Sequence, residues 1–232
     1  MLMPTTSTAV RPASSSQTVR NARPTPPPAT YQLNGPIEMM GAPMSFGRNG
    51  EIYGEGEPAD FVYKVISGCV RTYKVLADGR RQIGAFYLPG DVFGLEVGEE
   101  HGFSAEAIAA TKVLVVKRSA LMNLASRDSN VARELWTLTG RELARVQEHI
   151  LLLVKTAQER VVGFLFEMAA RRPAGDMVEL PMSRQDIADY LGLTIETVSR
   201  TLTNLEHEAA IELPNSRRIV LRNRPALKEM HA

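Results

Sequence analysis

Residues 183–205 of the chain are SRQDIADYLGLTIETVSRTLTNL, which has the spacing of two short helices joined by a tight turn. Ser183 is a favourable helix N-cap, and Asp186 stands three residues later in the capping-box position. Gly192 ends the first helix at a point that needs a left-handed residue, and Thr194 caps the second helix. The segment therefore predicts a helix-turn-helix.

The exposed side of the second predicted helix carries groups that suit the edges of DNA bases. An arginine can bond guanine O6 and N7 together, a carboxylate can accept from cytosine N4, and an apolar group can touch a thymine methyl. The N-terminal part of such a helix enters the major groove. We therefore expect base contacts from Ile195, Glu196, Thr197 and Arg200. Phosphate contacts, which suit hydroxyls, cations and capped helix ends, are expected from Ser183, Arg184, Ser199, Thr203, Arg217 and Arg218.

A hairpin after the second helix is typical of the wing of a winged helix-turn-helix. Residues 211–213 pair with residues 219–221 across a five-residue loop, which places Arg217 and Arg218 at the tip. Residues 176–232 hold nine acids and seven bases, so a DNA site here must segregate its charges. The alternative interpretation is a helical hairpin with an ordinary solvated face.

A long helix is predicted over residues 128–156. Its apolar positions alternate in steps of three and four from Trp136 onward, a seam of period 3.5 that lasts about three heptads. A narrow seam of this kind suits a two-stranded coiled coil, although a helix packed on the core of its own domain is the alternative. We expect a homodimer whose interface contains Leu143, Val146, Ile150 and Leu153.

The pattern of residues 44–117 is typical of β-strands. Short β-branched and aromatic runs alternate with turn signals at Gly68, Gly79 and Gly90, which lie eleven residues apart. Regular turns at this spacing predict an antiparallel sandwich or barrel. Asp78 and Gly79 are expected to form a tight two-residue hairpin turn, because both residue types tolerate positive φ.

Residues 1–36 are expected to form a disordered tail. They hold half of the 14 prolines, three arginines and no acid, with Ser and Thr between them. Such a segment cannot bury enough apolar surface to offset its ordering entropy. A proline-rich docking ligand is the alternative interpretation.

Composition bounds the class of protein and its compartment. A net charge of +1 excludes a broadly polycationic nucleic-acid coat. One cysteine excludes a disulfide framework within the chain and a multi-cysteine iron–sulfur or zinc site, and it favours a reducing cytoplasm. The longest aliphatic run, residues 150–154, is far below the roughly 20 residues of a membrane span, and no secretory signal is present.

Catalysis and metal binding are not expected. No nucleophile–base pairing stands out, so we expect a protein that is not an enzyme and uses no cofactor. The histidines are scattered without metal-ligand spacing. Cys69 lies in a predicted strand, where a free thiol usually behaves as a small buried hydrophobe.

Across residues 40–225 the chain resembles the Crp/Fnr superfamily of bacterial transcription regulators. Residues 194–200, TIETVSR, are similar to the Fnr-type recognition helix. Residues 149–165 resemble the Fnr dimer helix and hinge, and residues 89–94, PGDVFG, resemble a cyclic-nucleotide-binding jelly roll. The resemblance implies an α+β fold with an N-terminal antiparallel β jelly roll, a long dimerisation helix and a C-terminal winged helix-turn-helix. These domains would span residues 37–127, 128–156 and 157–232.

Two departures from the family bear on the signal that the protein would sense. Fnr proper holds an iron–sulfur centre with an N-terminal cysteine cluster, whereas residues 1–68 contain no cysteine, which excludes oxygen sensing by that route. Cyclic-AMP binders place an arginine and a serine on the phosphate, whereas residues 96–106 carry glutamates that would repel it. The pattern is closest to the FixK branch, which implies Fnr-like DNA recognition without a cofactor.

The resemblance implies a homodimeric activator of oxygen-limited or nitrogen-fixation-linked genes. It would bind a TTGA-N6-TCAA-like palindrome without a small-molecule effector, and its partners would be double-stranded DNA, a second copy of itself and RNA polymerase. The alternative is a sensor whose DNA binding depends on a nucleotide, haem or metabolite in the jelly roll. A DNA titration without ligand separates the two.

Overall fold

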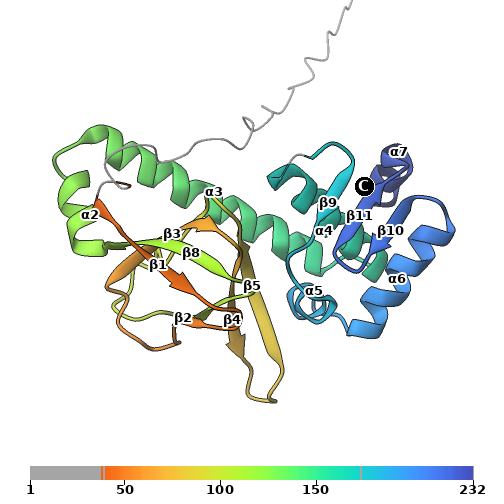
Figure 1. The fold of residues 1–232 in the computed structure, drawn as a ribbon, viewed down its shortest axis with the longest axis horizontal. Helices are drawn as coiled ribbons and strands as arrows, with labels where there is room; N and C mark the ends of the chain where they lie inside the picture. The colour runs from red at the N-terminus through yellow and green to blue at the C-terminus, as the bar shows by residue number, and fades with distance from the viewer. Residues whose placement is uncertain (1–37, 39, 173, 232) are drawn as a thin grey trace, which may run out of the picture. The chain divides into compact units, whose positions relative to one another are not determined.

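The computed structural model describes residue 38, residues 40–172 and residues 174–231. The predicted tail over residues 1–36 lies outside the described residues. Eight strands come first, followed by three helices and then by a smaller region of helices and short strands (Figure 1). The described residues from 40 onward belong to one compact unit.

Two four-stranded sheets form the N-terminal domain (Figure 1). One has the order β1-β8-β3-β6 and the other β2-β7-β4-β5, and the pairings within both are antiparallel. The antiparallel fold predicted from the glycine-spaced runs is confirmed. The strands are β1 (Ala42–Phe46), β2 (Glu51–Tyr53), β3 (Phe61–Ser67), β4 (Val70–Val75), β5 (Arg81–Tyr87), β6 (Val92–Phe93), β7 (Ser104–Ala107) and β8 (Thr111–Lys117).

Aromatic side chains hold the two sheets together. Phe93 of one sheet lies with its ring centroid 5.1 Å from that of Tyr63 and 5.0 Å from that of Tyr87, which comes from the other sheet. His101 is buried and stacks on Tyr53 with 3.5 Å between ring centroids. Aromatic pairs of this kind add about 0.5–1.5 kcal/mol beyond the burial of their area.

The turn between β4 and β5 differs from the predicted two-residue hairpin. The backbone N–H of Leu76 donates to the carbonyl of Arg80 at 2.8 Å, so residues 77–79 form a three-residue loop. Gly79 has a φ of +82°, whereas Asp78 does not adopt positive φ. The Asp78 carboxylate instead accepts from the backbone N–H of Arg80 at 3.0 Å, which stabilises the loop from one side.

Helix α3 (Ser129–Leu153) follows the short α2 (Arg118–Ala125) and has two apolar faces. One face packs on the N-terminal domain through the buried Val131 and the half-buried Leu135 and Leu138. A neighbouring face exposes Trp136, Leu143, Val146 and Ile150, whose exposed fractions lie between 44% and 81%. The predicted heptad seam and the alternative of a helix packed on its own domain therefore describe two different faces of α3.

The C-terminal part contains a helical scaffold and a small antiparallel sheet with the order β10-β11-β9 (Figure 1). A capping box of Thr156 and Glu159 begins the helix that follows α3, as the S/T-x-x-E pattern favours. The elements are α4 (Ala157–Arg171), β9 (Met177–Glu179), α5 (Arg184–Leu191), α6 (Ile195–His207), β10 (Ile211–Asn215), β11 (Arg218–Leu221) and α7 (Arg224–His231).

Two C-terminal features depart from the sequence analysis. Pairing in the hairpin is interrupted by an irregularity between Glu212 and Asn215 and resumes with Asn215 opposite Arg218, so its turn is shorter than the predicted five-residue loop. Proline is tolerated at position 214 because β10 is an edge strand, where the missing N–H does not cost a hydrogen bond to a neighbouring strand. Helix α7 was not predicted; it begins after Asn223, whose side chain accepts from the N–H of Ala226 at 3.1 Å.

Strands β4 and β5 share a hydrophobic core with helices α4 and α5. The Phe86 ring centroid lies 5.1 Å from that of Tyr190 and 6.2 Å from that of Phe164. Ile83 belongs to the same cluster of buried residues. These elements belong to separate predicted domains, so the contact between them was not expected from the sequence.

His149 connects the long helix to α5. Its ring stacks on Tyr190 at 3.9 Å between centroids, and its Nε2 lies 2.8 Å from the Tyr190 carbonyl, which can only accept. Burial lowers the pKa of the His149 imidazole, and the hydrogen bond to Tyr190 and the charge of Glu167 oppose this shift. The ring is therefore held neutral in the folded protein.

His149 should make the protein less stable in mild acid. Because its folded-state pKa is lowered, the unfolded chain takes up the proton first, so this contribution to stability is complete above pH ~6.5 and is lost as the pH falls. We expect urea unfolding to show a smaller loss of stability from pH 7.5 to 5.5 in His149→Gln than in the wild type. The exposed His207→Gln is the control, and an identical pH dependence in all three proteins would contradict this role.

Cys69 lies in the shared core and is buried. Burial raises the pKa of its thiol to about 12, so the group is a neutral thiol at physiological pH. The predicted burial of Cys69 is confirmed, although the residue lies just before β4 rather than within a strand. Among the described residues, none of the helices has both the length and the apolar character needed to cross a membrane.

Candidate nucleic-acid interface

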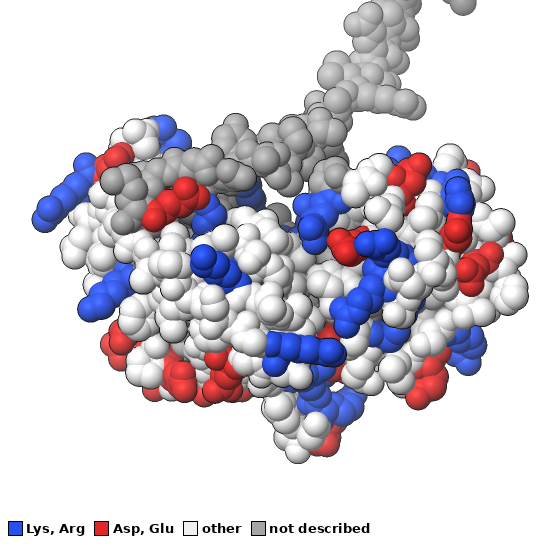
Figure 2. Space-filling model, viewed as in Figure 1, with Lys and Arg blue, Asp and Glu red and all other residues white. Residues whose placement is uncertain are grey.

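Surface charge alone does not mark the interface. On the face shown in Figure 2, basic side chains (blue) and acidic side chains (red) are interspersed. This mixture agrees with the net charge of +1. The candidate interface therefore has to be built from the geometry of α5, α6 and the hairpin.

The first helix of the motif begins and ends as its sequence predicts. The Ser183 hydroxyl accepts from the N–H of Asp186 at 3.1 Å, and the Asp186 carboxylate accepts from the N–H of Ser183 at 2.9 Å. The chain leaves α5 at Gly192, which has a φ of +62° and a ψ of 39°. Only glycine adopts this left-handed conformation without strain, so the predicted turn is confirmed.

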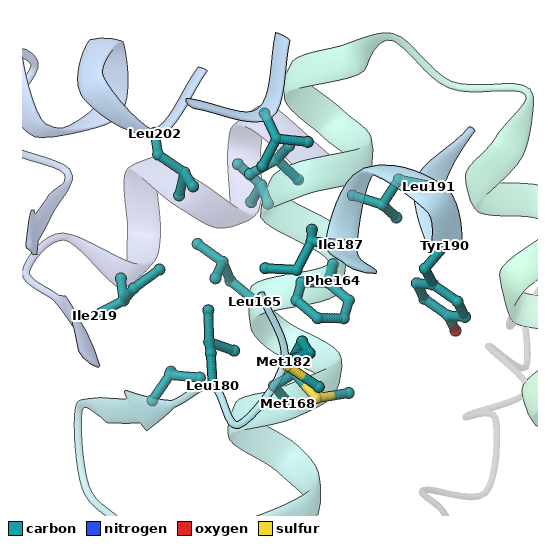
Figure 3. Packing of buried hydrophobic residues seen from close by; sticks show 14 of the residues in the cluster. Phe164, Leu165, Met168, Leu180, Met182, Ile187, Tyr190, Leu191, Leu202 and Ile219 are labelled. Atoms are coloured by element: carbon teal, nitrogen blue, oxygen red, sulfur yellow. The ribbon is translucent and has the colours of Figure 1, made fainter. Parts of the chain in front are cut away.

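The buried side of the motif rests on α4. Figure 3 shows Phe164, Leu165 and Met168 of α4 in one cluster with Ile187 of α5 and Leu202 of α6, with Phe164 next to Ile187. These side chains are buried almost completely, and each such burial is worth about 1.5–3 kcal/mol. The two helices of the motif are therefore fixed to each other by a common core.

Helix α6 presents its polar face to solvent. The Thr194 hydroxyl caps it by accepting from the N–H of Thr197 at 3.2 Å. The opposite side of α6 is buried against the core through Val198, Leu202 and Leu205, which are spaced three or four residues apart. The predicted base-contact residues therefore gather over the first two turns, with Thr197 half-buried and the others exposed. The exposed ones are Ile195, Glu196 and Arg200.

Both charged residues of this face are available for a partner. A hydrogen bond from its own backbone N–H, joined by one from the Thr194 hydroxyl, lowers the pKa of the Glu196 carboxyl, which is therefore an acceptor at neutral pH. Arg200 is exposed and forms no hydrogen bond or ion pair within the described part of the chain. One acceptor and one bidentate donor thus stand four residues apart on one helix face.

The N-terminus of α5 gives mixed support for phosphate binding. The hydroxyl and the backbone N–H of Ser183 both donate to the Asp186 carboxylate, at 2.7 and 2.9 Å, so Ser183 keeps no free donor for a phosphate. Arg184 is half-buried, and burial lowers the pKa of its guanidinium, although an arginine stays charged. Its Nη1 has no hydrogen-bond partner among the described residues.

The remaining predicted phosphate ligands are exposed. Arg217 at the hairpin turn donates to the Pro181 carbonyl, which ties the hairpin to the segment before α5. Arg218 follows it on the exposed side of β11. Ser199 and Thr203 are exposed on α6. The contact of Arg217 with Pro181 leaves no local sequence signal, because the two partners are 36 residues apart.

The fold and the exposed face of α6 define a class of protein, a winged helix-turn-helix joined to a jelly-roll domain. Two family descriptions match the chain: the Crp-like helix-turn-helix domain over residues 159–230 and the cyclic nucleotide-binding domain over residues 43–128. The described residues hold no group of three or more His, Cys, Asp or Glu side chains that could bind a metal ion.

Comparison with known proteins identifies the family. The chain is 53% identical over 200 residues to the nitrogen fixation regulation protein FixK of Azorhizobium caulinodans, covering 84% of this chain and 81% of FixK. It is 40% identical to the transcriptional activatory protein AadR of Rhodopseudomonas palustris, with 75% of each chain covered. The solved structure of FixK2 from Bradyrhizobium japonicum has a TM-score of 0.80 and 53% identity, covering 83% of this chain and 98% of that one. The chain belongs to the Crp/Fnr family of DNA-binding transcription regulators.

Proposed function

We propose that the protein is a homodimeric transcription activator that binds a TTGA-N6-TCAA-like palindrome without a small-molecule effector. The observation that carries this proposal is the exposed face of α6, where Glu196 and Arg200 present a carboxylate and a guanidinium group to solvent on a capped helix that packs on a buried core. The names of the relatives, a nitrogen fixation regulator and a transcriptional activator, favour a role in nitrogen-fixation-linked or oxygen-limited gene expression.

Base recognition is assigned to the first two turns of α6. Arg200 would bond guanine O6 and N7, and Glu196 would accept from cytosine N4. Ile195 and Thr197 would contact thymine methyl groups. Each good bidentate contact is worth about 1–3 kcal/mol of discrimination between bases. Arg217, Arg218, Arg184, Ser199 and Thr203 would hold the phosphates that fix the orientation.

Dimerisation is assigned to the exposed face of α3. Leu143, Val146 and Ile150 are the large apolar groups that a soluble helix would not leave in water without a partner. Leu153 is half-buried near the Gly192 turn and would lie at the end of the interface. Two copies related by a two-fold axis would place their recognition helices about 34 Å apart, as a palindrome requires.

Effector independence is supported by the jelly-roll interior. Aromatic rings from both sheets pack there, and the segment over residues 96–106 carries carboxylates rather than phosphate ligands. One observation favours the second candidate, a ligand-gated regulator. Glu96 Oε2 is buried without a hydrogen-bond partner among the described residues, and His101 Nδ1 has only Glu96 Oε1 nearby, at 3.3 Å, with no hydrogen bond of good geometry. Buried polar atoms of this kind are typical of a site that holds water or a polar ligand.

A cytoplasmic regulator rather than an enzyme fits the relatives and the single buried thiol. Activation would need contact with RNA polymerase through exposed loops.

The stoichiometry of the DNA complex tests the proposal. Sedimentation of the protein on a palindromic duplex, with no ligand added, should give two chains per duplex. A complex of one chain that forms equally well on a scrambled duplex would contradict it.

A further inference from the structure

The Asp186 carboxylate contacts two parts of the molecule at once. One oxygen, Oδ2, accepts from the backbone N–H and the hydroxyl of Ser183 and so caps α5. The other, Oδ1, accepts from Arg71 Nη1 at 2.6 Å and from Arg81 Nη2 at 2.8 Å. Arg71 and Arg81 belong to β4 and β5 of the jelly roll. A single side chain therefore joins the DNA-binding motif to the N-terminal domain.

These contacts are largely buried, and each of them joins a guanidinium group to a carboxylate. The exposed fraction is 3% for Asp186 and 7% for Arg71. Arg71 Nη2 also donates to Glu106 at 2.9 Å, and Arg81 Nε donates to Asp189 at 2.8 Å. Two guanidinium groups thus meet three carboxylates. Charge-assisted hydrogen bonds from the planar guanidinium fork are directional, so the network allows one relative orientation of the two parts.

Apolar contacts beside the network support the same arrangement. The Phe86 ring packs on Tyr190 of α5, and Gln82 Nε2 donates to the Tyr190 carbonyl at 3.3 Å. Apolar packing is non-directional and would tolerate sliding. The directional hydrogen bonds of the ion network fix the relative position of α5 and the jelly roll, which the apolar contact alone would not fix.

We infer that Arg71 and Arg81 are positioning residues for DNA recognition, which act through Asp186 to hold α6 in the orientation that a palindrome requires. The inference rests on the proposed function. Helices α5 and α6 share one core, so fixing α5 also fixes α6. If only a fraction of molecules holds this orientation, the apparent Kd rises by the inverse of that fraction. A ligand-gated regulator would obtain this orientation from its ligand, whereas here two arginines supply it permanently.

Spacing discrimination distinguishes positioning from general stabilisation. The probes are duplexes with TTGA and TCAA half-sites separated by five, six or seven base pairs, a single half-site and a scrambled duplex. Arg81→Gln is the main variant, because its side chain is partly exposed and its loss leaves Asp186 paired with Arg71. Arg80→Gln is the matched control, since Arg80 is an exposed neighbour that pairs with Asp78.

In fluorescence anisotropy, Arg81→Gln should raise the Kd for the six-base-pair spacing about tenfold, as expected when the competent fraction falls to roughly a tenth. Its preference for that spacing over five or seven base pairs should narrow. Its Kd values for the single half-site and the scrambled duplex should stay within about twofold of wild type, because these need no fixed spacing. Arg80→Gln should match the wild type on every duplex.

A second pair of variants keeps the test decisive if one protein is unstable. Asp189→Asn removes the carboxylate that accepts from Arg81 Nε. Because both substitutions break the same contact, their effects on the Kd should not add, and the double variant Arg81→Gln/Asp189→Asn should have a Kd similar to that of either single variant. Unchanged spacing preference in Arg81→Gln and Asp189→Asn, with wild-type specificity intact, would overturn the inference alone. Tighter binding would also overturn it, because the network would then hold an inactive orientation. A wild-type protein that does not distinguish the palindrome from the scrambled duplex would overturn the proposed function as well.

Discussion

The double variant Val146→Glu/Ile150→Glu should sediment as a single chain and lose binding to the palindrome. Both side chains lie on the exposed face of α3, so in one isolated chain the two glutamates cost little and the fold should persist. In a dimer the same positions would bring four carboxylates into an apolar seam, where like charges repel and lose their hydration.

The loss of DNA affinity should be large. Two linked half-sites bind about 10²–10⁴-fold more tightly than one, so a monomer should bind the palindrome at least about 100-fold more weakly. Sedimentation velocity and anisotropy measure the two effects on the same sample. Ala144→Glu, on an exposed position of α3 outside the seam, is the control and should stay dimeric. A double variant that remains a dimer would contradict the assignment of the seam.

Arg200→Ala should weaken binding to the palindrome by about 1–3 kcal/mol per half-site, which is roughly 5–150-fold. Among the described residues the Arg200 guanidinium has no hydrogen bond or ion pair, so its removal should leave the stability of the fold unchanged. The preference for guanine at one position of the half-site should relax, while the affinity for a scrambled duplex changes much less.

Arg222→Ala is the matched control for Arg200→Ala. It removes the same charge from the same domain, but Arg222 lies beyond the hairpin and pairs with Glu212. Its effect should be small and equal on specific and scrambled duplexes, as loss of general attraction predicts. Full base discrimination in Arg200→Ala would mean that α6 does not enter the major groove as proposed.

Local patterns made the DNA-binding motif predictable. The cap at Ser183, the left-handed Gly192 and the cap at Thr194 each act within four residues, and all three appear in the structure. The strands were predictable from β-branched and aromatic runs between regularly spaced turn glycines, and the exposed seam of α3 from its period of 3.5. The packing of Val131, Leu135 and Leu138 on the N-terminal domain, which occurs alongside this seam, was only an alternative to it in the sequence analysis. Helix α7 was missed although Asn223 carries a usable cap signal.

Contacts between distant parts of the chain left no local pattern. The bonds from Arg71 and Arg81 to Asp186 join residues 115 and 105 positions apart. In the sequence, Asp186 is fully explained as a helix cap, and nothing in its neighbourhood calls for two arginines. The same cap occupies both hydrogen-bond donors of Ser183. A serine at a helix N-terminus favours a phosphate contact, but the structure gives this contact no support at Ser183 because neither donor is free.

Anisotropy titration of the purified protein, unfolded and refolded to remove small molecules, tests the central claim most directly. The probes are a TTGA-N6-TCAA duplex and a scrambled duplex at several salt concentrations. We predict that the palindrome binds about 10³-fold or more tightly than the scrambled duplex with no ligand present. Equal and weak binding to both, falling steeply with salt, would mean phosphate attraction only and would contradict an effector-independent regulator of this sequence.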